Sequence, residues 1–297
     1  MPGGHSIADV HGVVAAHLPG YRIGSVVELG AGLDNVAYEV DGALVVRFSR
    51  EPDPRRRAAL VEHEARLLTA VAGVCPLPVP EPLFTATELG CLAYAKLPGV
   101  PLSELARPGR SAHGVSIAVE LGELLAALHA GPADRWAGLV DTDGQPPAQW
   151  LGEAGELYRA VVGHVPVGCR RAVEAFLDAP PPPAGHGLVF SHNDLGIEHV
   201  LVDPARWAVT GVIDWSDAAL VDPAYDFGLL YRDLGPAALR AALGRYPAED
   251  AEVAALAERA VFYARCSVFE DLAYGVDTGR TGYLDRAVGA MAWLFPA

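Results

Sequence analysis

The alternation of hydrophobic and polar positions predicts mostly strands in the first third of the chain. Segments that alternate with period two, or are rich in β-branched residues, are the expected strands: Gly24–Gly30, Asn35–Val40, Leu44–Arg50, Thr85–Leu89 and Cys91–Leu97. Gly42 and Gly90 lie between consecutive segments and mark turns. Apolar residues at helical spacing indicate two helices in this part, over residues 6–18 and 55–73.

Helical periodicity prevails after Pro98-Gly99-Val100-Pro101, which interrupts the pattern and marks the expected domain boundary. The expected helices are residues 116–129, 237–244, 251–272 and 281–294. Three short apolar segments predict buried strands over residues 188–190, 200–202 and 209–213. The 140s and residues 179–187, which include four consecutive prolines, are expected to be loops. Strands that precede helices in this way predict an α+β fold.

Composition and charge exclude several classes of protein. Apolar residues make up 51% of the chain, which suffices for a sizeable core, and no long uncharged apolar run predicts a membrane span. A formal net charge of −15 argues against a nucleic-acid partner and fits either a cationic substrate or simple solubility. The four cysteines are too widely spaced for a zinc knuckle, so we expect reduced thiols. Since the N-terminus lacks a basic region followed by an apolar segment, we expect a cytoplasmic protein.

Residues 190–215 carry the strongest sign of chemistry. They contain the pattern H-x-D-x-x-x-x-H, formed by His192, Asp194 and His199, and then Asp214 at the end of an apolar run. One carboxylate can sit beside an acceptor hydroxyl while further ligands hold metal ions on the phosphates. The layout therefore suits phosphoryl transfer from a nucleotide.

This pattern, followed by Ile213-Asp214-Trp215, resembles the aminoglycoside and macrolide phosphotransferase family, which has the protein kinase fold. The likeness extends in order to the segments Leu29–Tyr38, Leu44–Ser49, Glu64–Leu68 and Asp222–Phe227. It implies a two-lobed α+β fold, with a small β-rich nucleotide-binding lobe over residues 1–97. A larger, mainly helical lobe over residues 98–297 would hold the catalytic loop and the acceptor. The implied activity is transfer of a γ-phosphate to a hydroxyl of an antibiotic by a monomer.

The resemblance gives the residues of the motif their expected roles. Asp194 is the general base that accepts the proton of the attacking hydroxyl, and His192 organises its loop. His199 and Asp214 are the expected ligands of Mg²⁺. Family members that act on macrolides commonly have His at the position of His199, where protein kinases and many aminoglycoside kinases have Asn. Because imidazole is the softer ligand, we expect Mn²⁺ to serve as well; alternatively His199 only forms a hydrogen bond to Asp194 or Asp214.

Nucleotide contacts are expected in the first lobe. Two glycines there allow close approach to phosphates and unusual φ values. Arg47 stands where kinases have lysine, since Lys96 is the only lysine in the chain, and Glu64 is its expected ion-pair partner. Arg50 is expected on a solvated face, and the donor is either ATP or GTP. The full set of expected nucleotide-binding residues is Gly30, Gly32, Asp34, Asn35, Arg47, Glu64, Tyr94 and Ala95.

Acceptor contacts are expected between the motif loop and the C-terminal helices. The candidates are Asp217, Glu270, Asp271 and Tyr274. Aromatic residues within Val261–Trp293 favour an apolar macrolide, whereas many carboxylates would suit an aminoglycoside. Asp222 and Asp226 are expected to brace the loop through backbone N–H groups, although Asp226 could instead approach the substrate.

Other functions remain open at this point. The acceptor could be an aminoglycoside, a peptide antibiotic or a metabolite, and a nucleotide-binding pseudokinase is a remote alternative. A pseudokinase is expected to lack Asp194 or Asp214, and both are present. Asp222-Pro223 follows Asp214 too closely to leave room for the activation segment of a protein kinase.

Overall fold

The computed structural model describes residues 6–32, 34–185 and 187–296. The chain folds into two compact units. The first unit contains residues 1–98 together with 210–216, and the second contains residues 99–209 and 217–297. A segment that is distant in sequence, residues 210–216, therefore completes the N-terminal unit.

An antiparallel five-stranded sheet forms the centre of the first unit, in the order β1-β2-β3-β5-β4. Its strands are β1 (Val26–Ala31), β2 (Asn35–Val40), β3 (Leu44–Ser49), β4 (Pro82–Ala86) and β5 (Cys91–Ala95). Gly42 and Gly90 both have a φ of +68°, a left-handed conformation that glycine adopts without strain, and so they make the expected turns. Thr87–Leu89, expected to be part of a strand, is instead the short 3₁₀ helix η1.

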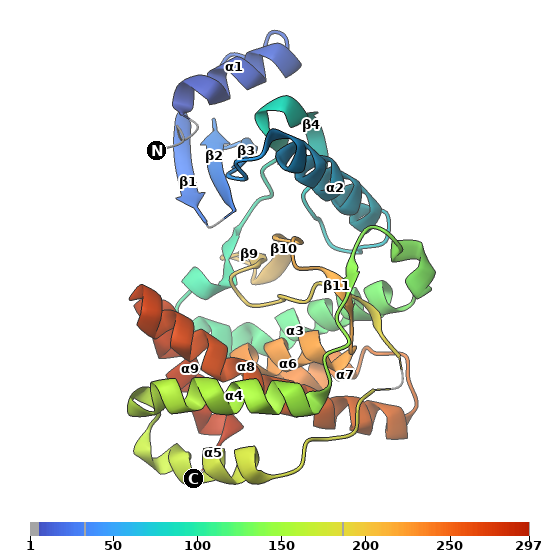
Figure 1. Cartoon of the computed structure of the whole chain (residues 1–297), viewed down its shortest axis with the longest axis vertical. Helices are drawn as coiled ribbons and strands as arrows, with labels where there is room; N and C mark the ends of the chain where they lie inside the picture. The colour runs from blue at the N-terminus through green and yellow to red at the C-terminus, as the bar shows by residue number, and fades with distance from the viewer. Residues whose placement is uncertain (1–5, 33, 186, 297) are drawn as a thin grey trace. The chain divides into compact units, whose positions relative to one another are not determined.

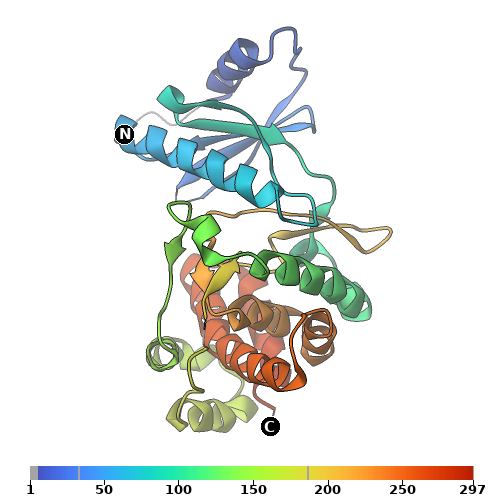
Figure 2. The ribbon, with the colours of Figure 1, turned by 90° about the vertical axis from the view of Figure 1, so that its right-hand side faces the viewer.

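Two helices accompany this sheet. Helix α2 (Pro54–Ala72) is capped by Asp53, whose carboxylate accepts hydrogen bonds from two backbone N–H groups of the first turn. Figure 2 shows the helix running along the sheet. Helix α1 (Ile7–His17) packs on alternate strand residues, which therefore share one face. This core contains Val10, Val13, Val14, Val36, Tyr38, Val40, Leu44, Val46 and Phe48.

The second unit is mainly helical (Figure 1). Helix α6 is its centre: nine of its residues, Ala224–Arg232, are buried, and it contacts α3, α7, α8 and α9. Gly122 of α3 lies so close to α7 that an added Cβ would come within 2.4 Å of the Ala242 carbonyl oxygen. The helices are α3 (Arg107–His129), α4 (Pro147–Val161), α5 (Val167–Asp178), α6 (Ala224–Leu234), α7 (Pro236–Leu243), α8 (Asp250–Thr278) and α9 (Thr281–Leu294).

Short strands and turns of the second unit connect these helices. The sheet β10-β9-β6 contains β6 (Val100–Pro101), β9 (Val200–Asp203) and β10 (Ala208–Val212), and β10 continues into the first unit. The sheet β7-β11-β8 contains β7 (Asp141–Thr142), β8 (Val189–Ser191) and β11 (Ala219–Val221). The 3₁₀ turns are η2 (Leu102–Glu104), η3 (Ala133–Trp136) and η4 (Val162–His164).

Helix α3 is long and apolar enough to cross a membrane by length and composition, and within the described ranges it alone passes this test. Most of its large apolar residues are buried in the second unit, where Ile117, Leu121, Leu124 and Leu128 lie in the core, whereas Val115 is exposed. Packing against α6, α7 and β8 therefore explains its composition, as for any core helix.

The observed elements confirm the predicted α+β fold class and correct several boundaries. Helix α3 begins at Arg107 rather than at residue 116, because Pro108 fits the first turn of a helix and Gly109 makes room for Trp207. Helix α4 begins within the 140s, where a loop is expected, and α5 is a helix that the pattern did not predict. The four cysteines are free thiols; Cys91 and Cys266 are buried, and Cys75 and Cys169 are partly buried.

Candidate active site

The predicted catalytic residues lie on one loop of the second unit. This 192–199 loop connects β8 with β9, and both strands are largely buried. His192 is fully buried, and its Nδ1 accepts a hydrogen bond from the backbone N–H of Asp194 at 3.3 Å. His199 donates from Nδ1 to the carbonyl oxygen of Asp194 at 2.8 Å. The two imidazoles thus fix the backbone on both sides of Asp194, whose side chain stays 44% exposed.

The surroundings of Asp194 raise the pKa of its carboxyl group to about 7. Partial burial is the largest cause, and the negative charges of Glu198 and Asp217 add to it, while His199 acts in the opposite direction. Nδ1 of His199 is 3.4 Å from Oδ2 of Asp194. A carboxylate with a pKa near neutrality can accept a proton and release it again under ordinary conditions.

Two carboxylates of α6 hold the 192–199 loop. Asp226 is fully buried, and its Oδ2 accepts the backbone N–H of Asn193 at 3.2 Å; the N–H groups of Leu195 and His192 also bond to this carboxylate. Burial raises the pKa of Asp226 to about 6, although the three N–H groups favour the charged form. Asp233 adds a further brace by accepting the N–H of Ile197 at 3.1 Å.

Asp222 does not bind the 192–199 loop, although it was expected to brace it. Its carboxylate accepts the N–H of Ala224 at 2.9 Å, Nε of Arg259 at 2.8 Å and the hydroxyl of Tyr263 at 3.3 Å. It therefore caps the first turn of α6 and ties it to α8, rather than bracing the loop itself.

Sequence reasoning missed Arg232, which connects the loop to the helical core. Its guanidinium is buried, lies 2.8 Å from Asp233 and faces Asp271 of α8 at 3.4 Å. Because Asp233 also binds the loop at Ile197, the ion pair transmits the position of α8 to the loop. A charged pair in an otherwise apolar helical segment was the signal that could have identified it.

In the first unit, four of the predicted residues form one charged cluster. Arg47 lies 2.5 Å from Glu64, on the face of β3 opposite Val46 and Phe48. Tyr94 forms a hydrogen bond with Arg47, and Asp214 is close enough to interact with its charge. Burial opposes the charge of Arg47, but Glu64, Tyr94 and Asp214 outweigh it, so the pKa of Arg47 is raised.

The β1–β2 hairpin carries the other predicted nucleotide residues. Gly30 and Gly32 are exposed and neither has a positive φ, so the expected unusual backbone is not present. A Cβ added at Gly30 would meet nothing within 4 Å, and one at Gly32 would lie 3.8 Å from the carbonyl oxygen of Asn35. Gly32 donates its N–H to the carbonyl of Asn35 at 2.9 Å, which closes the hairpin next to exposed Asp34. Leu33, part of the segment that resembles the family, lies outside the described residues.

Arg50 is exposed as expected, but it also has a structural role in this hairpin. Its Nη1 donates to the carbonyl of Gly32 at 2.6 Å, and its backbone N–H donates to the carbonyl of Asp34 at 2.7 Å. Ala95 is exposed at the end of β5, where it pairs with Leu44.

His199 and Asp214 each carry a group that can ligate a divalent metal ion bound together with phosphates. The Nδ1–H of His199 is held by a carbonyl, which leaves Nε2 as the nitrogen that carries the lone pair in this tautomer. Asp214 is exposed, has a strained φ of +64°, and its Oδ1 accepts the hydroxyl of Ser216 at 2.9 Å. No group of three or more His, Cys, Asp or Glu residues that could hold a metal occurs in the described part of the chain.

The four predicted acceptor residues lie around the 192–199 loop and on α8. Asp217 is exposed, and its carbonyl accepts the side-chain amide of Asn193 at 3.1 Å. Glu270 is partly buried, and burial raises its pKa to about 7. Asp271 is buried and faces Arg232. Tyr274 is exposed, and its ring packs edge-on against Tyr283 at 4.8 Å.

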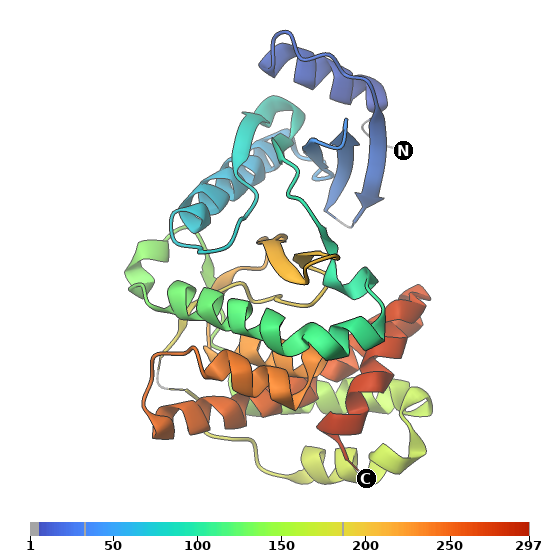
Figure 3. The ribbon, with the colours of Figure 1, turned by 180° about the vertical axis from the view of Figure 1, so that it is seen from behind.

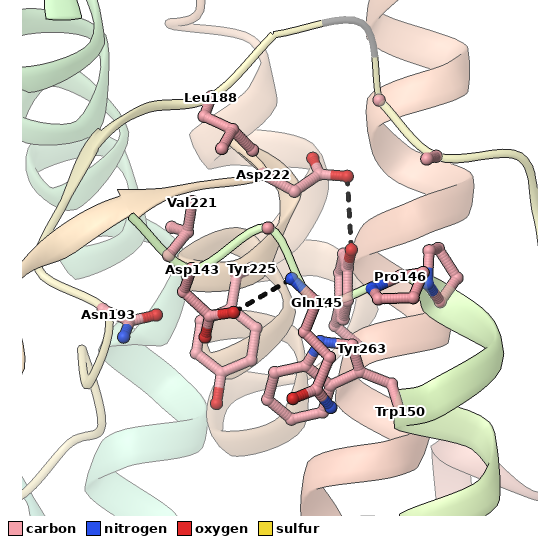
Figure 4. Close-up of a pocket in the computed structure, with 14 residues that line it drawn as sticks. Asp143, Gln145, Pro146, Trp150, Leu188, Asn193, Val221, Asp222, Tyr225 and Tyr263 are labelled. Carbon is pink, nitrogen blue, oxygen red and sulfur yellow. Dashed lines mark hydrogen bonds between the residues drawn. The ribbon is translucent and has the colours of Figure 1, made fainter. Parts of the chain in front are cut away.

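A cavity of about 230 Å³ lies beside the 192–199 loop, and none of these four side chains lines it. Figure 4 shows Asn193 of the loop on one side and the rings of Trp150, Tyr225 and Tyr263 together on another. The Trp150 ring is 5.1 Å from that of Tyr225 and 5.8 Å from that of Tyr263. The polar residues in the lining are few: Asp143, Gln145, Asn193 and Asp222.

Most of this lining comes from segments that sequence reasoning treated as loops. Asp143 and Gln145 follow β7, and the N–H of Gln145 donates to Asp143 at 3.0 Å, as Figure 4 shows. Leu188 precedes β8. The signal available in the sequence was Trp150 within a helical pattern directly after Pro146-Pro147, which is typical of a helix start.

A sequence model described as the phosphotransferase enzyme family matches residues 25–262. The chain belongs to this family. The match begins just before β1, includes the Arg47 cluster and the 192–199 loop, and ends within α8. No curated protein sequence matches the chain.

Solved structures of phosphotransferases match almost the whole chain. One is macrolide 2′-phosphotransferase MphH from Brachybacterium faecium, which is 26% identical with a TM-score of 0.62 over 96% of this chain and 98% of that one. A macrolide 2′-phosphotransferase type I is 25% identical with the same TM-score over 99% of both chains. The GDP and kanamycin complex of APH(2″)-IIIa has a TM-score of 0.69 at 20% identity, over 95% of this chain and 97% of that one. At that identity the last match shows the shared fold.

Proposed function

We propose that this phosphotransferase moves the γ-phosphate of ATP or GTP to a hydroxyl of a macrolide antibiotic. The observation that carries the proposal is the 192–199 loop with the aromatic cavity beside it. We further propose that residues 1–97 form the nucleotide-binding lobe and residues 98–297 the catalytic and acceptor-binding lobe. The enzyme would act as a cytoplasmic monomer.

Asp194 would act as the general base in this reaction. Its carboxylate stays accessible, its pKa lies near 7, and its backbone is held on both sides by His192 and His199. A positioned base of this kind contributes about 10²–10⁴-fold to the rate. His192 is fully buried, so its part is to orient Asp194 rather than to contact substrate.

Arg47 would bind the phosphates of the nucleotide, oriented by Glu64 and Tyr94. The exposed hairpin residues Gly30, Gly32 and Asp34, together with Asn35, would cover the phosphates, and Tyr94 and Ala95 would offer backbone groups to the base. The structure of APH(2″)-IIIa is a complex with GDP and kanamycin, which supports a nucleotide as co-substrate. His199 and Asp214 would each ligate Mg²⁺ or Mn²⁺, which neutralises charge on the transferring phosphate when bound.

The lining of the cavity next to Asn193 supports an acceptor with a largely apolar surface. Three aromatic rings dominate its wall, and Asp222, one of its two carboxylates, is already paired with Arg259. The two macrolide 2′-phosphotransferases at 25–26% identity support the same acceptor class.

An aminoglycoside is the second candidate acceptor. Glu198 and Asp217 are close enough to Asp194 to raise its pKa, and the net charge of the chain is −15. Such a surrounding attracts a polycation. Asp217, Glu270, Asp271 and Tyr274 would then be the acceptor contacts.

Mass spectrometry of phosphate transfer tests the proposal directly. Purified protein would be incubated with Mg²⁺ and ATP or GTP, and with macrolides, aminoglycosides and tuberactinomycin-type peptides in separate reactions. A mass gain of one phosphate on a macrolide is the expected result. A gain on polyamine acceptors alone would refute the macrolide proposal, and no transfer to any acceptor would refute antibiotic phosphorylation.

A variant pair tests the cavity as the acceptor site. Trp150→Ala removes part of the aromatic wall and is expected to raise the acceptor KM by about tenfold, without changing nucleotide affinity. Trp207→Ala is the matched control, because Trp207 is also partly buried and stacked, on His113 at 4.7 Å, but does not line the cavity. Equal effects of the two variants would place the acceptor elsewhere.

A further inference from the structure

A second cavity in the catalytic unit is lined by arginines, although the chain is strongly acidic. It has a volume of about 440 Å³ and lies between the start of α3, the end of α6 and helix α9. Figure 3 shows the start of α3 beside α9. Arg107, Arg110, Arg232 and Arg286 all contribute to its lining.

The charges at this cavity are only partly compensated. Its two carboxylates are Asp233, which binds Arg232, and Asp285. Among the residues that the structure describes, neither Arg107 nor Arg110 forms an ion pair with a carboxylate. Arg232 is paired with Asp233 and Asp271, and Arg286 with Glu198. The uncompensated positive charge of the lining is therefore that of Arg107 and Arg110, next to the single further carboxylate of Asp285.

The pKa of Arg110 reflects the positive charges around it. Its Nη1 donates to the carbonyls of Ser103 at 2.9 Å and Leu105 at 2.6 Å, which fixes the guanidinium at the start of α3. Burial lowers the pKa of Arg110, and repulsion from Arg286 and Arg107 lowers it further, against the attraction of Asp233. An anion in the cavity would relieve this repulsion.

The first turn of α3 adds to the positive electrostatic potential at this cavity. The cap residue Ala106 offers no side-chain hydrogen bond, and no acidic residue lies in the first turn, so the positive end of this 23-residue helix is not neutralised by the usual means. Helix starts of this kind favour phosphate oxygens when basic side chains converge on them.

We propose that this arginine-lined cavity binds a phosphate oxyanion, either inorganic phosphate or the phosphate group of a small monoester. Arginine is the side chain best suited to hold such oxygens, because its planar guanidinium can donate two parallel hydrogen bonds. The cavity is separate from the aromatic cavity beside Asn193, with which it shares no lining residue.

Arg286 connects the phosphate site to the 192–199 loop. Its Nη2 binds Glu198 of that loop at 3.3 Å, and its Nε is buried without a hydrogen-bond partner among the described residues. A phosphate that competes for this guanidinium would weaken its hold on Glu198. Occupancy is therefore expected to lower turnover, an effect that rests on the proposed function, whereas binding itself does not.

Isothermal titration calorimetry with inorganic phosphate, and separately with glucose 6-phosphate, tests the site in the full chain at low salt. Arg107→Gln removes an exposed lining charge and is expected to weaken binding about tenfold. Gly289→Leu fills the cavity, because a Cβ there already meets Arg107 at 3.2 Å, and should weaken binding at least as much. Arg171→Gln is the matched control, since Arg171 is an exposed helical arginine outside the cavity.

Saturable binding that weakens in both cavity variants and persists in Arg171→Gln supports the site. Stronger binding of the sugar phosphate would assign a monoester, and equal or weaker binding would assign the free anion. The proposal would be overturned if no saturable binding occurred below about 10 mM, or if Arg171→Gln lost binding as much as the cavity variants did.

The variant Arg47→Ala controls for binding at the nucleotide site and is expected to bind phosphate like the wild type. If Arg47→Ala alone abolishes phosphate binding, phosphate occupies the nucleotide site instead. Inhibition of turnover by phosphate that persists in Arg107→Gln would refute the coupling through Arg286.

Discussion

His129 of α3 is expected to make the stability of the catalytic unit depend on pH. The imidazole is 8% exposed; Nε2 pairs with the hydroxyl of Ser191 at 2.9 Å and Nδ1 with that of Tyr246 at 3.1 Å. Burial lowers its pKa from 6.5 to about 3. No carboxylate contributes to this shift, so nothing compensates a charge placed there.

The sign and size of the effect follow from the two pKa values. Below pH 6.5 the unfolded chain binds a proton at His129, while the folded chain stays neutral down to about pH 3. Stability is therefore lost as pH falls through this window. The resulting loss in the free energy of unfolding is about 2 kcal/mol at pH 5, and it approaches about 5 kcal/mol below pH 3.

Urea unfolding of the wild type and of His129→Gln, followed by circular dichroism from pH 7 to pH 5, measures this contribution. The glutamine keeps polar contacts to both hydroxyls but does not titrate. The wild type should lose about 2 kcal/mol more than the variant over this range. The comparison with the variant is needed because other groups also make stability depend on pH. Four carboxyl groups have raised pKa values, so they stabilise the folded protein as pH falls, opposite to His129: Asp194, Asp226, Glu270 and Asp271.

Parallel pH dependences in the two proteins would refute the reasoning. Such a result would mean that His129 is protonated in the folded protein, or that it is solvated there. Protonation of His129 is also expected to affect the active site, because Ser191, the hydrogen-bond partner of His129, directly precedes the 192–199 loop.

The remaining predictions concern the site itself. Asp194→Asn should reduce kcat by at least about 10² with little change in nucleotide affinity; near-normal turnover would remove Asp194 from the role of base. Asp226→Ala leaves three backbone donors unpaired and should lower the free energy of unfolding by about 3 kcal/mol in urea titrations, with partial rescue in Asp226→Asn; a neutral alanine variant would contradict the bracing role. Arg47→Ala should weaken nucleotide binding about tenfold, as calorimetry can measure, and Arg47→Lys should weaken it less; unchanged binding would exclude the phosphate contact. Mn²⁺ should support turnover at least as well as Mg²⁺, and activity about tenfold weaker in Mn²⁺ would count against coordination by His199.

The sequence determined the local elements and the order of the motifs. Period-two alternation located β2 and β3 to within a residue, because side chains on successive strand positions face opposite sides of a sheet. The family membership inferred from His192, Asp194, His199 and Asp214 is confirmed by the match over residues 25–262. Their roles as base and metal ligands stay predictions.

Only the tertiary structure decided which of the distant carboxylates support the loop. Asp226 braces the loop as the resemblance implied, but Asp222, expected in the same role, binds Arg259 instead, and Asp233, which was not expected there, binds the N–H of Ile197. Both cavities likewise join segments that are far apart in the chain, such as Trp150 with Tyr263 and Arg107 with Arg286. Periodicity reports the burial of single elements, whereas partners at this distance are set by how helices pack, and packing is a property of the folded chain.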